Sequence, residues 1–280
     1  MKKIKTDNKT LIMCILNLTP DSFSDGGRFN TTDKAVKHAI QMQKDGADII
    51  DIGGESTRPG AKTISINEEL KRVTPVVKEL VNQITIPLSI DTYKSEVAEK
   101  TLNLGVSMVN DITALRGDKK LVNIIADYDV PVCLMHMKGK PNNMQIKPAY
   151  NNVVPEIHDF LKERSEYALS CKIKKKNITI DPGIGFGKRT GQGIEDNCEI
   201  LNRLFEFKNL GFPILIGASR KTFIGNICGR EKTLEVSERL EGSLAAACIA
   251  VMNGADIIRT HDVKETRKCV DLVDCVIKKI

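Results

Sequence analysis

The sequence predicts a single-domain α/β fold of the (β/α)8 TIM-barrel class. Short apolar segments recur along its 280 residues, and amphipathic segments of helical length lie between them. Residues 46–50 and 254–258 share the phrase Gly-Ala-Asp-Ile-Ile, and each phrase follows an amphipathic stretch that ends in glycine, as helix C-termini often do. Segments that are apolar throughout are typical of parallel strands buried on both faces. Eight alternating units therefore predict a closed barrel rather than an open sheet.

The predicted strands are short, and three of them begin with proline. In chain order they are Leu11–Leu16, Asp48–Ile52, Pro87–Ile90, Met108–Val109, Pro131–Met135, Ile178–Ile180, Pro213–Ile216 and Asp256–Ile258. Helical patterns lie between them, for example at Thr32–Asp45, Ile66–Asn82, Lys94–Leu104 and Glu238–Asn253. No linker or low-complexity stretch interrupts this series. We therefore expect one domain over residues 1–280, with its core at about residues 10–277.

Composition restricts the class of protein. Hydrophobic residues make up 41% and charged residues 28%, which is enough apolar material for a large folded core. No stretch approaches the ~18 apolar residues of a membrane helix, and no secretory signal pattern is visible at the start. The eight cysteines form no C-x-x-C pair, which favours reduced thiols in a cytoplasmic protein. The net charge of +6 suits anionic small molecules, and the lack of interleaved aromatic residues argues against nucleic acid.

Polar side chains follow every predicted strand. They are Asn17, the Glu55-Ser56-Thr57-Arg58 segment, Asp91, Asn110-Asp111, His136, Asp181, Ser219-Arg220-Lys221 and Arg259-Thr260-His261. In a (β/α)8 barrel the carboxyl ends of all strands meet at one rim, where active sites lie. One polar residue after a strand is usually a turn former, but eight such groups predict a single site.

Several of these segments resemble the dihydropteroate synthases, a family of pterin-binding barrels. The resemblance is carried, in order, by residues 17–29, 51–61, 110–112, 134–137, 181–188, 217–221, 239–246 and 259–263. It extends from about residue 10 to 270. It implies an enzyme that joins 6-hydroxymethyl-7,8-dihydropterin pyrophosphate to 4-aminobenzoate, with Mg²⁺ as cofactor. It also implies inhibition by sulfonamides, which mimic 4-aminobenzoate, and assembly as a homodimer.

The resemblance implies a deep pterin pocket. Its residues are expected to be Asp91, Asn110, Ile112, Met135, Asp181, Gly217 and Lys221. A pterin presents a donor-rich edge, which a buried carboxylate such as Asp181 accepts well. Asp91 either contacts the pterin directly or orients other residues.

A second subsite is expected to hold the pyrophosphate leaving group. The family pattern places Asn17, Thr57, Arg58, Arg259 and His261 there, with Asn17 as the magnesium ligand. For 4-aminobenzoate it implies a shallower site formed by Phe23, Pro59, Phe186, Lys221 and Thr222. The residues expected to act in catalysis are Asp25, Arg58, Lys221, Arg259 and His261.

Some features depart from the family pattern. Thr222 stands where serine is common, and Thr260 where valine is common. The segment Thr190–Gly193 makes the sixth loop longer than usual, and we expect either a neutral surface insertion or an effect on sulfonamide access.

Two other functions stay open at this stage. One is a methyltetrahydrofolate-binding methyltransferase barrel, which needs no pyrophosphate site. The other is a pterin-binding paralogue without catalysis, whose sequence would lack the cationic residues that this chain retains.

Overall fold

The computed structural model describes residues 9–19, 28–58, 60–191, 193–229 and 231–278, and eight parallel strands form its central sheet. The strands are β1 (Leu11–Asn17), β2 (Ile49–Gly53), β3 (Leu88–Asp91), β4 (Met108–Asp111), β5 (Val132–Met135), β6 (Ile178–Asp181), β9 (Leu215–Ile216) and β10 (Ile257–Thr260). Their order is β6-β5-β4-β3-β2-β1-β10-β9. A bridge between Ile180 and Ile214 joins the two ends, so the sheet closes into the predicted barrel.

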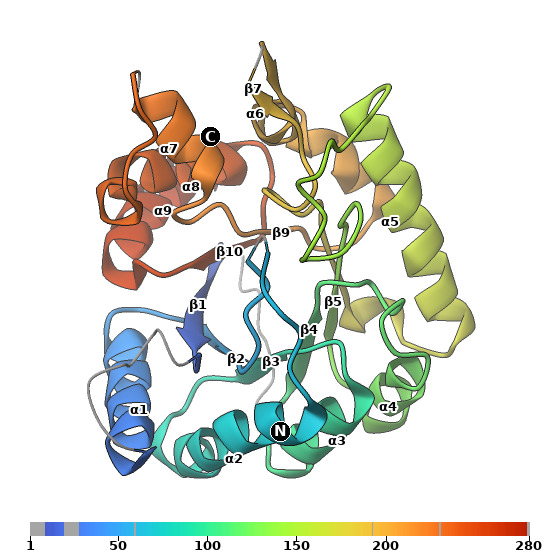
Figure 1. The fold of residues 1–280 in the computed structure, drawn as a ribbon, viewed down its shortest axis with the longest axis vertical. Coiled ribbons are helices and arrows are strands. Elements are labelled where there is room, and N and C mark those ends of the chain that lie inside the picture. The colour runs from blue at the N-terminus through green and yellow to red at the C-terminus, as the bar shows by residue number, and fades with distance from the viewer. Residues whose placement is uncertain (1–8, 20–27, 59, 192, 230, 279–280) are drawn as a thin grey trace.

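Helices surround the strands on the outside of the barrel (Figure 1). They are α1 (Arg28–Lys44), α2 (Ile66–Gln83), α3 (Ser95–Asn103), α4 (Leu121–Tyr128), α5 (Val153–Ser170), α6 (Asp196–Asn202), α7 (Thr222–Cys228), α8 (Leu240–Met252) and α9 (Val263–Lys278). The predicted helix at Glu238–Asn253 is divided: a short 3-10 turn at Val236–Glu238 precedes α8. None of the described helices is long and apolar enough to cross a membrane.

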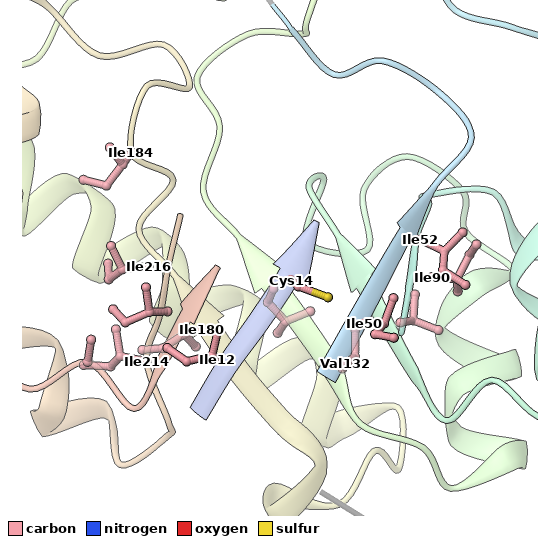
Figure 2. Close-up of a cluster of buried hydrophobic side chains, with 14 of the residues drawn as sticks. Ile12, Cys14, Ile50, Ile52, Ile90, Val132, Ile180, Ile184, Ile214 and Ile216 are labelled. Atoms are coloured by element: carbon pink, nitrogen blue, oxygen red, sulfur yellow. The ribbon is translucent and has the colours of Figure 1, made fainter. Parts of the chain in front are cut away.

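On most barrel strands the apolar side chains alternate between two environments. One set points outward and packs beneath the helices, as Ile12, Cys14, Ile50 and Ile90 do in Figure 2. The other set points into the barrel and forms a separate cluster, which we call the plug. The plug consists of Leu11, Met13, Ile49, Met108, Cys133, Leu215 and Ile257, each 2% exposed or less. Strands buried on both faces explain why the sequence shows unbroken apolar runs.

The extension after β6 folds as a small hairpin. Strands β7 (Thr190–Gly191) and β8 (Ile194–Glu195) pair antiparallel, and the Glu195 carboxylate accepts hydrogen bonds from the Thr190 hydroxyl at 2.8 Å and from the Gly191 N–H at 2.8 Å. All eight cysteines lie among the described residues, and none of them is paired in a disulfide.

Candidate active site

The predicted polar residues meet in a pocket at the carboxyl ends of the strands. The pocket is lined by Thr57, Asp91, Asn110, Ile112, Met135, Asp181, Ile184, Phe186, Gly217, Lys221 and Arg259. All seven residues expected around a pterin are in this set. The period of two along each strand explains the arrangement: on β4, for example, Met108 lies in the plug and Asn110 lines the pocket.

Two buried carboxyl groups form the floor of the pocket. Burial raises the pKa of Asp91 to about 7, although the nearby Arg259 charge works in the opposite direction. Burial also raises the pKa of Asp181 to about 6, and a hydrogen bond from the Gly183 N–H at 2.7 Å partly counters that effect. Both groups therefore sit where a donor-rich ligand edge would stabilise their ionised forms.

An arginine at the carboxyl end of β10 binds Asp91 of the floor and a further buried acid, Asp51. Arg259 Nε donates to Asp51 Oδ2 at 2.7 Å, and its NH2 group donates to Asp91 Oδ2 at 2.9 Å. Burial would lower the pKa of Arg259, but the charges of Asp51 and Asp91 raise it further above its usual value. The guanidinium is thus charged and fixed, with donors to spare for an anion.

Lys221 connects the floor of the pocket to an aromatic wall. Its ammonium lies 4.0 Å from the centre of the Phe186 ring, and its aliphatic stem runs over Gly185, where an added Cβ would come within 3.1 Å of Lys221 Cδ. Burial, together with the charge of Arg259, lowers the pKa of Lys221 to about 8. The structure therefore brings together Lys221 and Phe186, as expected for the aminobenzoate site.

Further polar and cationic groups follow β9 and β10 at the rim. His261 Nδ1 lies 3.0 Å from the Ser219 hydroxyl, and Arg220 is held by Asp262 through an Nε–Oδ2 bond of 3.0 Å. Burial, followed by the charges of Arg259 and Arg220, lowers the pKa of His261 to about 4. Arg58 is exposed, and its charge also lowers the pKa values of His261 and Lys221. Arg58 and Arg259 as cations, with the neutral His261 as a hydrogen-bonding group, are suited to an anionic ligand beside the pocket.

Chain comparisons identify the family. Residues 13–261 match the family of pterin binding enzymes. The dihydropteroate synthase of Clostridium beijerinckii is 44% identical over 99% of this chain and 98% of its own length. The chain belongs to the dihydropteroate synthases.

Solved structures of this family have the same fold. The Clostridium difficile enzyme, determined in the presence of pteroic acid, matches with a TM-score of 0.88 at 47% identity, over 96% of this chain and 97% of that one. The Xanthomonas albilineans enzyme with 4-aminobenzoic acid matches with a TM-score of 0.89 at 44% identity, over 97% of this chain and 94% of that one.

The remaining predicted residues lie around the pocket or outside the described part. Asn17 ends β1 beside Gly53, at the same rim. Thr222 is exposed at the first residue of α7 and is not among the residues that line the pocket. Phe23, Asp25 and Pro59 lie outside the described residues, so their roles stay predictions.

An ion cluster holds the base of the loop that carries Thr57 and Arg58. Lys94 donates to Glu55 at the start of this loop, to Glu69 of α2 at 2.6 Å and to the carbonyl of Ile64 at 2.8 Å. All three ionic side chains are 10% exposed or less. The loop therefore leaves the barrel from a fixed base.

Sequence reasoning missed three residues of this region. Ile184 lines the pocket. Asp51 lies beneath it, fully buried, and binds Arg259. Lys188 is 1% exposed and donates to the carbonyls of Gly183 and Phe186 at 2.8 and 3.0 Å, which holds the loop after β6. A charged residue at an inward position of an apolar strand would have identified Asp51, but no local signal distinguishes Lys188.

The donor set at the rim fits Mg²⁺ in one particular mode. The described residues contain no cluster of three or more His, Cys, Asp or Glu side chains that could enclose a metal ion. Mg²⁺ often uses only one or two protein oxygens and completes its shell with water and substrate phosphates. The amide oxygen of Asn17, at the rim beside the cationic groups, fits that mode.

Proposed function

We propose that the rim pocket binds a pterin pyrophosphate and 4-aminobenzoate in adjoining subsites and joins them to give 7,8-dihydropteroate and pyrophosphate. One observation carries this proposal. A buried floor that presents Asp91, Asn110 and Asp181 lies directly beside a rim that carries Lys221 and Arg259. Acceptors suited to a heterocycle and cations suited to phosphates are thus combined in one pocket.

In this proposal the pterin ring lies in the deep part of the pocket. Asp181 accepts from its donor edge, Asn110 bonds to the same heterocycle, and Ile112 and Met135 form the apolar walls. Asp91 contributes by holding Arg259 in place through their 2.9 Å bond. A donor edge of the pterin gives Asp181, whose pKa is raised, a further hydrogen bond that stabilises its ionised form.

The pyrophosphate lies over the cations in the proposed complex. Arg58, Arg259 and His261 stabilise the negative charge that develops on the leaving oxygen, and Thr57 lies at the edge of this subsite. We propose Asn17 as the protein ligand of Mg²⁺, which when bound neutralises phosphate charge. Asp25, from the first loop, stabilises the cationic pterin carbon.

The reaction breaks the bond between the pterin methylene carbon and the pyrophosphate oxygen, which keeps the bonding electrons. The amine nitrogen of 4-aminobenzoate then uses its lone pair to form the new C–N bond and releases a proton. Phe186, Phe23, Pro59 and the stem of Lys221 pack the aminobenzoate ring, and Thr222 holds its carboxylate. Sulfonamides compete for this ring site.

Two further properties belong to the proposal. We propose a homodimer that uses α8 and α9, because Met252, Leu272 and Val276 are at least 51% exposed on these two packed helices. A monomer mass in light scattering would contradict it. We also propose a cytoplasmic location, because all eight cysteines are free thiols. Recovery outside the cytoplasmic fraction of lysed cells would contradict it.

The decisive test is pyrophosphate release from pterin pyrophosphate in the presence of Mg²⁺ and 4-aminobenzoate. We expect release to depend on 4-aminobenzoate and to fall at least about 100-fold in Lys221→Ala, because a charged contact to the reacting groups is lost. Absence of release in the wild type, with pterin binding retained, would instead indicate a binding protein without catalysis. Methyltetrahydrofolate would then be tested next.

A further inference from the structure

One oxygen atom beneath the pocket holds a residue of each subsite. Asp51 Oδ2 accepts from Arg259 Nε at 2.7 Å and also from Asn110 Nδ2 at 2.9 Å. Asn110, on β4, belongs to the pterin subsite. Arg259, on β10, belongs to the pyrophosphate subsite. Asp51, on β2, is fully buried and is not among the pocket-lining residues.

We propose that Asp51 is a positioning residue that fixes Asn110 and Arg259 together and so couples the pterin and pyrophosphate subsites. This inference rests on the proposed function, since it concerns the same two subsites. Asp51 acts through its two neighbours and does not touch either ligand.

The first consequence concerns the orientation of Asn110. An asparagine amide has a donor end and an acceptor end of nearly equal size, so an unconstrained amide can present either end to a ligand. An ionised carboxylate only accepts hydrogen bonds, so Asp51 requires the NH2 group of Asn110 to point toward it. The Asn110 oxygen is then available to the pocket as an acceptor, which suits the donor-rich edge of a pterin.

The second consequence concerns the guanidinium. Arg259 uses one N–H on Asp51 and another on Asp91, at 2.7 and 2.9 Å. A guanidinium has five N–H donors in a rigid plane, so two anchored donors determine where the other three point. Those three are available to an anion at the rim. A shift of Asp51 would therefore move the amide and the guanidinium at the same time.

The position of Asp51 is poorly explained by stability alone. Its second oxygen, Oδ1, is buried without a hydrogen-bond partner among the described residues. Ion pairs of this kind contribute less to stability than well-packed apolar side chains of similar volume. The need to orient two ligand-binding side chains explains why an aspartate stands at position 51.

The simpler alternative is that Asp51 serves only as counter-ion to Arg259. The two readings differ in what happens to pterin binding once Arg259 has been removed. If Asp51 also orients Asn110, its loss still weakens pterin binding in an Arg259→Met background. If it is a counter-ion only, its loss then has no further effect.

The experiment compares Asp51→Asn, Arg259→Met and the double variant by calorimetric titration. The probes are 6-hydroxymethylpterin, which carries no phosphate, and inorganic pyrophosphate with Mg²⁺. Asp51→Asn is expected to weaken both probes, each about 10- to 100-fold, because each subsite loses a hydrogen bond to a charged group. The double variant is expected to bind the pterin at least about tenfold more weakly than Arg259→Met does.

Ser89→Ala is the matched control. Ser89 is the register neighbour of Asp51 on β3, is fully buried, and its hydroxyl has no hydrogen-bond partner among the described residues. It is expected to bind both probes like the wild type. If Asp51→Asn does not fold, Arg259→Met can still be compared with the double variant, which removes both charges. That comparison still distinguishes a positioning role of Asp51 from a counter-ion role.

Equal pterin affinity in Arg259→Met and the double variant would overturn the inference. So would an Asp51→Asn variant that loses affinity for pyrophosphate alone. Failure of the wild type to bind either probe would be a different result, since it would contradict the proposed function itself.

Discussion

Three strands carry both a plug residue and, two residues further on, a polar residue in or beneath the pocket, yet the two layers differ in polarity and charge. On β2 the plug residue Ile49 is followed by Asp51, and on β10 Ile257 is followed by Arg259. The plug is apolar and has no polar group to satisfy. The floor contains acids whose pKa values are raised, and Lys221 in the loop after β9 has a lowered pKa, so burial opposes the charged forms of all three groups.

On these strands, stability and ligand binding depend on different residues. The amino-terminal half contributes burial and thus stability, and the carboxyl-terminal half gives up some of that stability to keep charged groups ready for ligands. Substitutions in the two layers should therefore have opposite signatures, which makes the comparison testable.

The largest expected effect lies in the plug. Met108→Ala removes a fully buried side chain from the centre of the barrel, and we expect a loss of about 2–5 kcal/mol in the free energy of unfolding. Chemical denaturation measures it. Activity per folded molecule is expected to stay within about threefold of the wild type, because the floor above keeps its hydrogen bonds.

Ile146→Ala, at a side chain that is 73% exposed, is the control and should change the unfolding free energy by no more than about 0.5 kcal/mol. A plug variant as stable as this control would remove the distinction between the two layers.

The floor is expected to respond in the opposite direction. The folded-state pKa of Asp181 is about 6, above its ordinary value of 3.8. The stability that this group contributes is therefore fully present below pH 3.8 and is lost as the pH rises through about 6. Asp181→Asn avoids this loss. We expect it to be more stable than the wild type by about 1–3 kcal/mol at pH 7, with a difference that shrinks toward pH 4, while pterin binding is impaired.

Denaturation curves from pH 4 to 8 test this sign. Asp118 provides the contrast, because burial raises its pKa less than the hydrogen bonds from Ser95 and Lys120 lower it. Its contribution is therefore present at neutral pH and lost in acid, and Asp118→Asn should be less stable than the wild type at pH 7. Destabilisation by both variants would contradict the assignment of the floor.

The smallest expected effect concerns the base of the loop that carries Thr57 and Arg58. Glu55→Gln removes the charge that ties the Thr57–Arg58 loop to Lys94, and Lys94 keeps Glu69 as its partner. We expect the KM for pterin pyrophosphate to rise about three- to tenfold with little change in kcat, because only the placement of the loop is disturbed.

Glu79→Gln is the matched control, since this exposed acid accepts a hydrogen bond at 3.0 Å from Gln83 of the same helix, α2. It should leave KM unchanged. An equal effect of both variants would show that the loop base has no special role.

The sequence predicts the barrel well because its evidence is repeated. Eight apolar runs and the phrase shared by residues 46–50 and 254–258 all support the same architecture, and every predicted strand is confirmed. The seven expected pterin residues line one pocket for the same reason, since strand ends converge by geometry.

What the sequence does not reveal depends on distant partners. Asp51 lies within the predicted strand Asp48–Ile52, but only the contacts with Asn110 and Arg259, 59 and 208 positions away, reveal which groups it holds. Lys188 follows a glycine-rich turn and gives no sign that it will be buried against His136, whose Nδ1 lies 3.1 Å from its ammonium. Pairings of this kind cannot be predicted from local composition.

The closure of the barrel has a consequence for how the molecule opens. Strand β9 has two residues, and its junction with β6 rests on the single Ile180–Ile214 bridge, whereas β1 and β2 share five register pairs. Local opening proceeds most easily where the fewest hydrogen bonds must break. At the carboxyl ends of these two strands, Asp181 and Gly217 lie on either side of the seam, and both line the pocket. We therefore expect local opening of the barrel to begin between β6 and β9. Such opening would change the width of the pocket before it disturbs the rest of the fold.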